Sequence, residues 1–119
     1  MLRLIPAFLG ALLAASSGVL ISNPQTFRLV TVLRETIEQL AQPDTDYSFS
    51  DWSDGEEAQK EMDAHVTALQ SGDLEGLARL RMLFAPTGQL QEISIASGWS
   101  EEFLELASRF DEAIKGLPS

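Results

Sequence analysis

The clearest structural pattern in this chain lies in residues 100–115, Ser-Glu-Glu-Phe-Leu-Glu-Leu-Ala-Ser-Arg-Phe-Asp-Glu-Ala-Ile-Lys. Their apolar side chains recur at the spacing of one helix face, and polar side chains fill the positions between them. The pattern predicts an amphipathic helix over 101–115, with Ser100 as its N-cap. Such a helix buries its apolar face against other elements, so we expect a packed helical domain. The apolar face consists of Phe103, Leu106, Ala107, Phe110 and Ile114.

The first helical pattern of the domain follows Asn23-Pro24. Asparagine caps helices well and proline suits the first helical position, so the pair predicts a helix over 24–42. Pro43 ends the pattern. The apolar face expected for this helix consists of Phe27, Val30, Leu33, Ile37, Leu40 and Ala41.

Two more helices are expected in the middle of the chain. Asp54 and Glu57 have the spacing of a capping box, which predicts a helix over 55–70. Asp73 is the expected cap of the next helix, over 74–84.

Residues 89–96 fit two kinds of element. Ile93 and Ile95 alternate as in a strand, whereas Leu90 and Ile93 also have helical spacing. A lone strand would have no partner in this chain, so a helix is favoured. The predicted fold class is all-α, a small bundle of four to five short helices behind an apolar N-terminal segment. Residues 1–22 are expected to be separate from a single acidic helical domain over 23–119.

The first 22 residues are apolar and contain one charged side chain, Arg3. The apolar run Leu4–Ala15, followed by small residues, is typical of a secretory signal peptide. Leu4–Ile21, about 18 residues, is also near the lower limit for a membrane anchor. A buried first helix, or a start codon placed too early, is the third interpretation. We expect an exported (periplasmic or secreted) or membrane-anchored protein, with the cytoplasm as the alternative.

The chain is acidic and has no cysteine. It carries 18 acidic and 8 basic residues, a formal net charge of −10. A field of this sign repels phosphate backbones and anionic membrane surfaces, so we expect no nucleic-acid partner, and membrane contact only through residues 1–22. The lack of cysteine excludes disulfides and zinc-thiolate sites. A basic protein partner is compatible with this charge.

The sequence contains no evident catalytic constellation. His65 is the only histidine, and any Ser-His-Asp arrangement would need it as the base. It lies within the helix over 55–70, at the edge of the apolar face, where a structural or surface role is expected. Glu61 lies four residues earlier, at the spacing of an ordinary helix-surface pair. We therefore expect no catalytic residue and no cofactor.

The richest group of carboxylates lies in residues 44–57. Tested as a calcium loop starting at Asp44, it has Phe49 where glycine is required and Gly55 where glutamate is required. We therefore expect no metal site. The group consists of Asp44, Asp46, Asp51, Asp54, Glu56 and Glu57.

Aromatic residues stand beside these acids, at the edges of loops. Trp52 precedes the helix over 55–70, and Trp99 precedes the last helix. A tryptophan ahead of a helix usually packs against its first turn, whereas an exposed tryptophan would anchor a partner. The candidate partner-binding residues are Tyr47, Asp51, Trp52, Asp54 and Trp99.

Residues 83–95, Leu-Phe-Ala-Pro-Thr-Gly-Gln-Leu-Gln-Glu-Ile-Ser-Ile, run on to Gly98-Trp99 and Glu102-Phe103-Leu104. Together with Asp51-Trp52 and Asp54-Gly55 upstream, they resemble a small family of uncharacterised, acidic bacterial proteins, over residues 30–113. The resemblance implies a domain of unknown function and no particular activity. In size and acidity alone, the chain is also similar to bacterial immunity proteins, which neutralise basic toxins.

These observations favour a non-catalytic protein-binding module, immunity-like in character, that recognises a basic protein partner. It should present an exposed acidic and apolar patch near Tyr47, Trp52 and Trp99. One alternative is a small carboxylate- or metal-dependent hydrolase that uses the 44–57 cluster. Another is a structural helper in an envelope complex, anchored by residues 1–22.

Overall fold

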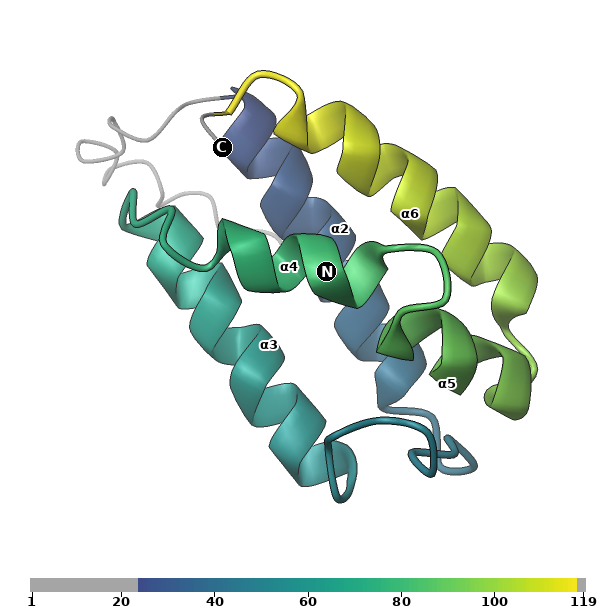
Figure 1. The fold of residues 1–119 in the computed structure, drawn as a ribbon. Helices are drawn as coiled ribbons and strands as arrows, with labels where there is room; N and C mark the ends of the chain where they lie inside the picture. The colour runs from purple at the N-terminus through teal and green to yellow at the C-terminus, as the bar shows by residue number, and fades with distance from the viewer. Residues whose placement is uncertain (1–23, 118–119) are drawn as a thin grey trace, which may run out of the picture.

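The central element of the fold is α2 (Pro24–Leu40), which packs against α3 (Gly55–Gln70) and against α6 (Ser100–Ile114). The computed structural model describes residues 24–117. In this part of the chain the elements are helices joined by turns, so the all-α prediction is confirmed. Figure 1 shows α4 (Leu77–Phe84) crossing in front of α2, and α5 (Gln89–Ser97) beside the beginning of α6.

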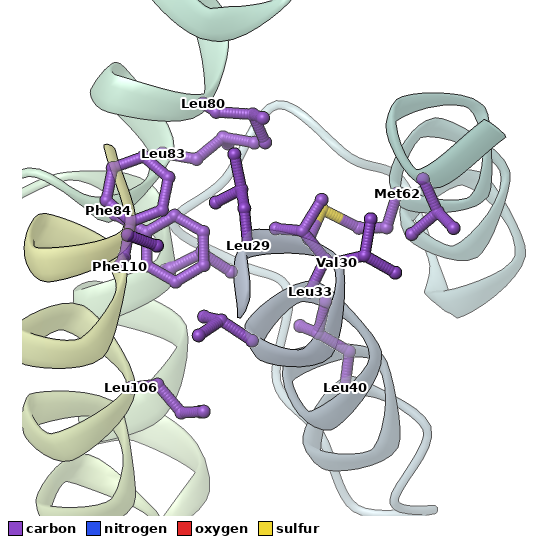
Figure 2. Close-up of a cluster of buried hydrophobic side chains, with 14 of the residues drawn as sticks. Leu29, Val30, Leu33, Leu40, Met62, Leu80, Leu83, Phe84, Leu106 and Phe110 are labelled. Carbon is purple, nitrogen blue, oxygen red and sulfur yellow. The ribbon is translucent and has the colours of Figure 1, made fainter. Parts of the chain in front are cut away.

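The core surrounds α2 because this helix is buried on two sides. Figure 2 shows Val30 turned toward Met62 of α3, while Leu29 lies toward Phe84 and Phe110. Leu29 is fully buried, whereas Phe27 is 72% exposed. The expected apolar face was therefore wrong at Phe27, and also at Ala41, which is exposed. The sequence pattern assumed a single apolar stripe, but a helix between two neighbours needs a wider one.

The predicted helices form with small shifts of their ends. Residues 55–70 are helical as expected, and residues 89–97 settle the choice between strand and helix in favour of helix. Gly98, with φ of 87°, ends α5 in the left-handed conformation that glycine adopts readily. The first predicted helix ends at Leu40 rather than at residue 42.

Two expected caps were wrong. Asp73 accepts a bond from the amide of Glu75 at 2.9 Å, and α4 begins only at Leu77, after Gly76. The Asp73 side chain thus stabilises the turn that precedes the helix. Ser100 is the first residue of α6, and Trp99 stands at the cap position without a capping side-chain bond.

The expected apolar segment, residues 1–22, lies outside the described residues. Its cleavage, anchoring or burial, and its separation from the domain, stay predictions. None of the helices within residues 24–117 is long and apolar enough to cross a membrane.

Candidate functional site

The site is built around the beginning of α3, which Asp54 caps as predicted. An Asp54 carboxylate oxygen accepts the amide of Glu57 at 3.0 Å. The Glu57 carboxylate in turn accepts the amide and the hydroxyl of Ser53, at 2.5 and 3.0 Å. The reciprocal bond of this box therefore reaches one residue further back than the usual pattern. Glu56 and Glu57 also place negative charge where the helix dipole favours it.

The loop over residues 41–54 is held in place by specific bonds. The Tyr47 hydroxyl donates to the carbonyl of Leu40 at 2.7 Å. The amide of Asp46 donates to the Ser97 hydroxyl of α5 at 2.8 Å, which ties the loop to a helix 51 residues further along the chain. The amide of Asp51 donates to the side-chain oxygen Oε1 of Gln89 at 3.2 Å. The loop is thus fixed to both ends of α5.

A second set of bonds fixes the loop to α3 and α4. The Trp52 indole donates to Glu61 at 3.0 Å. The Arg79 guanidinium of α4 donates to both oxygens of Glu61, at 2.8 and 2.9 Å, and to Asp51 at 3.2 Å. His65 Nε2 lies 2.8 Å from Glu61. We call Asp51, Trp52, Glu61, His65 and Arg79 the Glu61 cluster.

Charge and hydrogen bonding shift the pKa values in this cluster. The bonds from Arg79 are the main cause that lowers the pKa of Glu61 to about 2, with burial acting in the opposite direction. Glu61 returns the effect, mainly through its hydrogen bond, and raises the pKa of Arg79. Both groups therefore stay charged at neutral pH, and the cluster is a permanent ion pair between α3 and α4.

An open hollow of about 920 Å³ lies where the loop meets the start of α3. Its lining includes Tyr47 and four carboxylates but no lysine, arginine or histidine. We call this site the acidic hollow. Its carboxylates are Asp44, Asp46, Asp54 and Glu56.

The side chains of the acidic hollow have defined local environments. Asp46 accepts the amide and hydroxyl of Ser48, at 2.9 and 2.6 Å, and these bonds lower its pKa. Burial, and secondarily the charge of Asp54, raises the pKa of Tyr47. The hollow therefore carries negative charge at neutral pH beside a neutral phenol.

The chain around the acidic hollow is acidic over a long stretch. Between Arg34 and Lys60 it carries eight acidic residues and no basic one. Phe49, in the same loop, is 66% exposed. The loop that lines the acidic hollow thus carries both negative charge and an exposed aromatic ring.

The five predicted partner-binding residues do not form one patch. Tyr47 and Asp54 line the acidic hollow, whereas Asp51 and Trp52 belong to the Glu61 cluster. Trp52 and Trp99 are only 4% and 3% exposed, so they pack inside the fold and do not present surface anchors. Burial of both side chains agrees with the expectation that a tryptophan just before a helix packs against the protein.

Sequence reasoning missed the partners of Glu61. Its pairing with His65 was expected from their spacing, but Trp52 and Arg79 reach it from other segments. Arg79 lies 18 residues further along the chain, and no local pattern signals a contact at that separation. In the sequence, Phe49 stands out only as a mismatch to the calcium-loop pattern, because the exposure of its ring depends on how the loop folds.

The six carboxylates of residues 44–57 have different surroundings: four line the acidic hollow, and the other two bond to Arg79 and to Ser53. Within residues 24–117, no group of three or more histidine, aspartate or glutamate side chains is arranged to hold a metal ion. Asp51 pairs with Arg79, and Asp54 caps α3. The alternative of a carboxylate- or metal-dependent hydrolase stays a prediction.

Comparisons with known proteins found no matching family model, no matching curated protein and no matching solved structure. The resemblance to small acidic bacterial proteins accordingly stays a prediction.

Proposed function

We propose that the protein is a non-catalytic binding module that recognises a basic protein partner, immunity-like in character, through the acidic hollow. The observation that carries the proposal is a hollow lined by four carboxylates with no cation among its lining side chains. Uncompensated negative charge attracts a basic surface and speeds its association.

The fixed shape of the loop supports the proposal. Bonds to α2 and α5 hold the loop at Tyr47 and Asp46, so little conformational freedom would be lost on binding. Phe49, in the same loop, offers an exposed aromatic ring. Aromatic residues of this kind often supply a large share of the affinity in protein interfaces.

The proposal is tested with fluorescent peptide pools of equal length, one rich in Arg and Lys and one in which Gln replaces them. We expect the basic pool to bind, and its affinity to fall about tenfold or more when salt is raised from low to physiological concentration. Phe49→Ala should weaken binding of the basic pool by about tenfold. Binding of the neutral pool to the same degree would refute the proposal.

Two charge variants with the same net change separate a specific hollow from general attraction. One neutralises the acidic hollow with amides, which keep the side-chain oxygens that accept hydrogen bonds at Asp46 and Asp54. The other neutralises exposed carboxylates of α6. We expect the first to lose about tenfold in affinity and the second less than about threefold, whereas equal losses would leave only non-specific attraction. The acidic hollow variant combines four substitutions, Asp44→Asn, Asp46→Asn, Asp54→Asn and Glu56→Gln. The α6 variant combines four others, Glu101→Gln, Glu102→Gln, Glu105→Gln and Glu112→Gln.

A further inference from the structure

A second surface feature lies on another face, between α4 and α6. It is a groove of about 340 Å³ whose walls are mostly apolar, with Arg81, Gln91 and Asp111 among the lining residues, and it shares no residue with the acidic hollow. We call it the phenylalanine groove. Its aromatic lining consists of Phe84, Phe103 and Phe110.

The groove is preformed by stacked rings. Phe84 and Phe110 have ring centroids 4.3 Å apart at an interplanar angle of 9°, and Phe103 stacks on Phe84 at 6.4 Å. Leu104, on the rim, is 57% exposed. The three rings are at most 4% exposed and form the floor of the groove, so the apolar surface open to water comes from Leu104 and from the half-buried Ala107 and Ile114. This surface favours an apolar occupant.

One end of the groove lies close to the point where the described chain begins. Ile114 lines the groove, and Gly116, two residues later, approaches Gln25 so closely that a Cβ at Gly116 would lie 2.9 Å from its side chain. Figure 1 shows the beginning of α2 beside the end of α6. The chain that precedes Pro24 therefore joins the domain at this end of the groove.

The sequence that precedes this point is apolar like the groove, and it is long enough to extend along the groove. Leu4–Ala15 is apolar, and Arg3 is the only charged side chain before residue 24. The groove follows α6 from Phe103 to Ile114, about 16 Å at 1.5 Å per residue. Residues 16–23 can span up to about 26 Å when extended, so the apolar run can reach the whole groove.

We propose that the phenylalanine groove is the docking site of the chain's own apolar segment, Leu4–Ala15. A tethered segment has an effective concentration of the order of millimolar, which favours it over a separate partner of similar chemistry. Docking removes the apolar residues of the segment and of the groove from water together. This inference is independent of the proposed recognition of a basic partner.

The test uses the full chain, which has no native cysteine, with Leu9→Cys as a reporter. The rate of thiol alkylation is measured in two further backgrounds, Leu104→Glu in the groove and Ile95→Glu on α5. Both parent residues are 57% exposed, so neither change should unfold the domain, and circular dichroism checks this. We expect Leu104→Glu to speed alkylation about fivefold or more and Ile95→Glu less than about twofold. Equal rates in all backgrounds would overturn the proposal.

Disulfide trapping gives a second readout in the same full chain. Leu9→Cys is combined with Ala107→Cys in the groove or with Thr67→Cys on the exposed side of α3. We expect the groove pair to form an intramolecular disulfide at least about tenfold faster. Equal rates would contradict docking in the groove. Protection or cross-linking that rises with protein concentration would instead assign the groove to a second copy of the chain.

Discussion

Glu61 connects three segments of the fold, although its sequence neighbourhood indicates only the pairing with His65. It accepts bonds from Trp52 in the loop and from Arg79 in α4, and it contacts His65 in its own helix. Its side chain is 27% exposed and that of Arg79 is 31% exposed, so solvent screens the pair only in part. We therefore expect this carboxylate to stabilise the fold more than an exposed ion pair would.

Glu61→Gln tests this expectation. The amide keeps the shape of the side chain but removes the charge that Arg79 requires, and we expect a loss of about 1–3 kcal/mol in the free energy of unfolding at pH 7. Glu35→Gln is the control. Glu35 pairs with Arg109 through two bonds but is 45% exposed, so its loss should stay below about 1 kcal/mol. Urea titrations give the free energy of unfolding of both variants. Equal losses would contradict the expectation that the Glu61 ion pair stabilises the fold more than the Glu35 ion pair does.

The same carboxylate predicts a dependence of stability on pH. The folded pKa of Glu61, about 2, lies below the value in an unfolded chain. Its contribution is therefore fully present above about pH 4.5 and is lost as the pH falls toward 2. The stability difference between the wild type and Glu61→Gln should be largest near neutral pH and shrink through this range. A difference that stays constant down to pH 2 would argue against the low pKa.

At the scale of elements, the turn between α4 and α5 shows strain at one residue and close contact at the next. Thr87 has φ of 61°, a left-handed conformation that is costly for a β-branched side chain. Gly88 follows, and a Cβ there would lie 2.6 Å from the carbonyl oxygen of Met82. The turn therefore needs glycine at 88 and tolerates threonine at 87 at a cost.

Thr87→Gly should stabilise the protein. Glycine adopts positive φ without the steric cost, although it also increases the entropy of the unfolded chain. We expect a net gain of about 0.5 kcal/mol, seen as a higher melting temperature in calorimetry. A lower melting temperature would mean that the side-chain bond from Thr87 to the carbonyl of Pro86 outweighs the strain.

Gly88→Ala should destabilise the protein by about 2 kcal/mol or more, because the blocking atom belongs to the backbone and cannot turn aside. Gly55→Ala is the matched control. A Cβ at Gly55 would lie 3.3 Å from the Tyr47 hydroxyl, the far end of a side chain, so its effect should be small. Thermal unfolding measures the melting temperatures of both variants. Similar values would mean that the close approach of the Met82 carbonyl does not restrict residue 88.

The sequence predicted those features of the fold that depend on neighbouring residues, and it missed those that depend on contacts between distant segments. The cap at Asp54 and the face of α6 rest on neighbouring residues, and both formed as expected. The start of α4 was placed too early because the apolar spacing includes Leu74, which is packed against the core in a turn before the helix. The Glu61 cluster and the acidic hollow depend on segments brought together by folding, which a single sequence does not reveal.

At the scale of the whole molecule, the uneven distribution of charge opposes folding. The stretch between Arg34 and Lys60 has eight acidic residues and no basic one, and the fold brings much of it to the acidic hollow. Like charges held close together repel one another, and dissolved salt screens this repulsion.

Stability should therefore rise with salt. We expect the melting temperature to increase by a few degrees, about 0.5–1 kcal/mol, between low and physiological salt. The acidic hollow variant with four neutralised carboxylates should show a smaller increase than the wild type. Sodium chloride titrations followed by calorimetry measure both, and a melting temperature that falls with salt would contradict the prediction.

The two buried tryptophans also give the protein a pair of built-in optical reporters. Trp52 stands beside the ionised Glu61, whereas the indole nitrogen of Trp99 is buried with no hydrogen-bond partner. Their emission should therefore differ in colour and in quenching. Single-tryptophan variants, Trp52→Phe and Trp99→Phe, would report on different parts of the fold during denaturation. A shared midpoint would identify one cooperative unit, and separate midpoints would show that the loop beside α3 opens before the junction of α5 and α6 or after it.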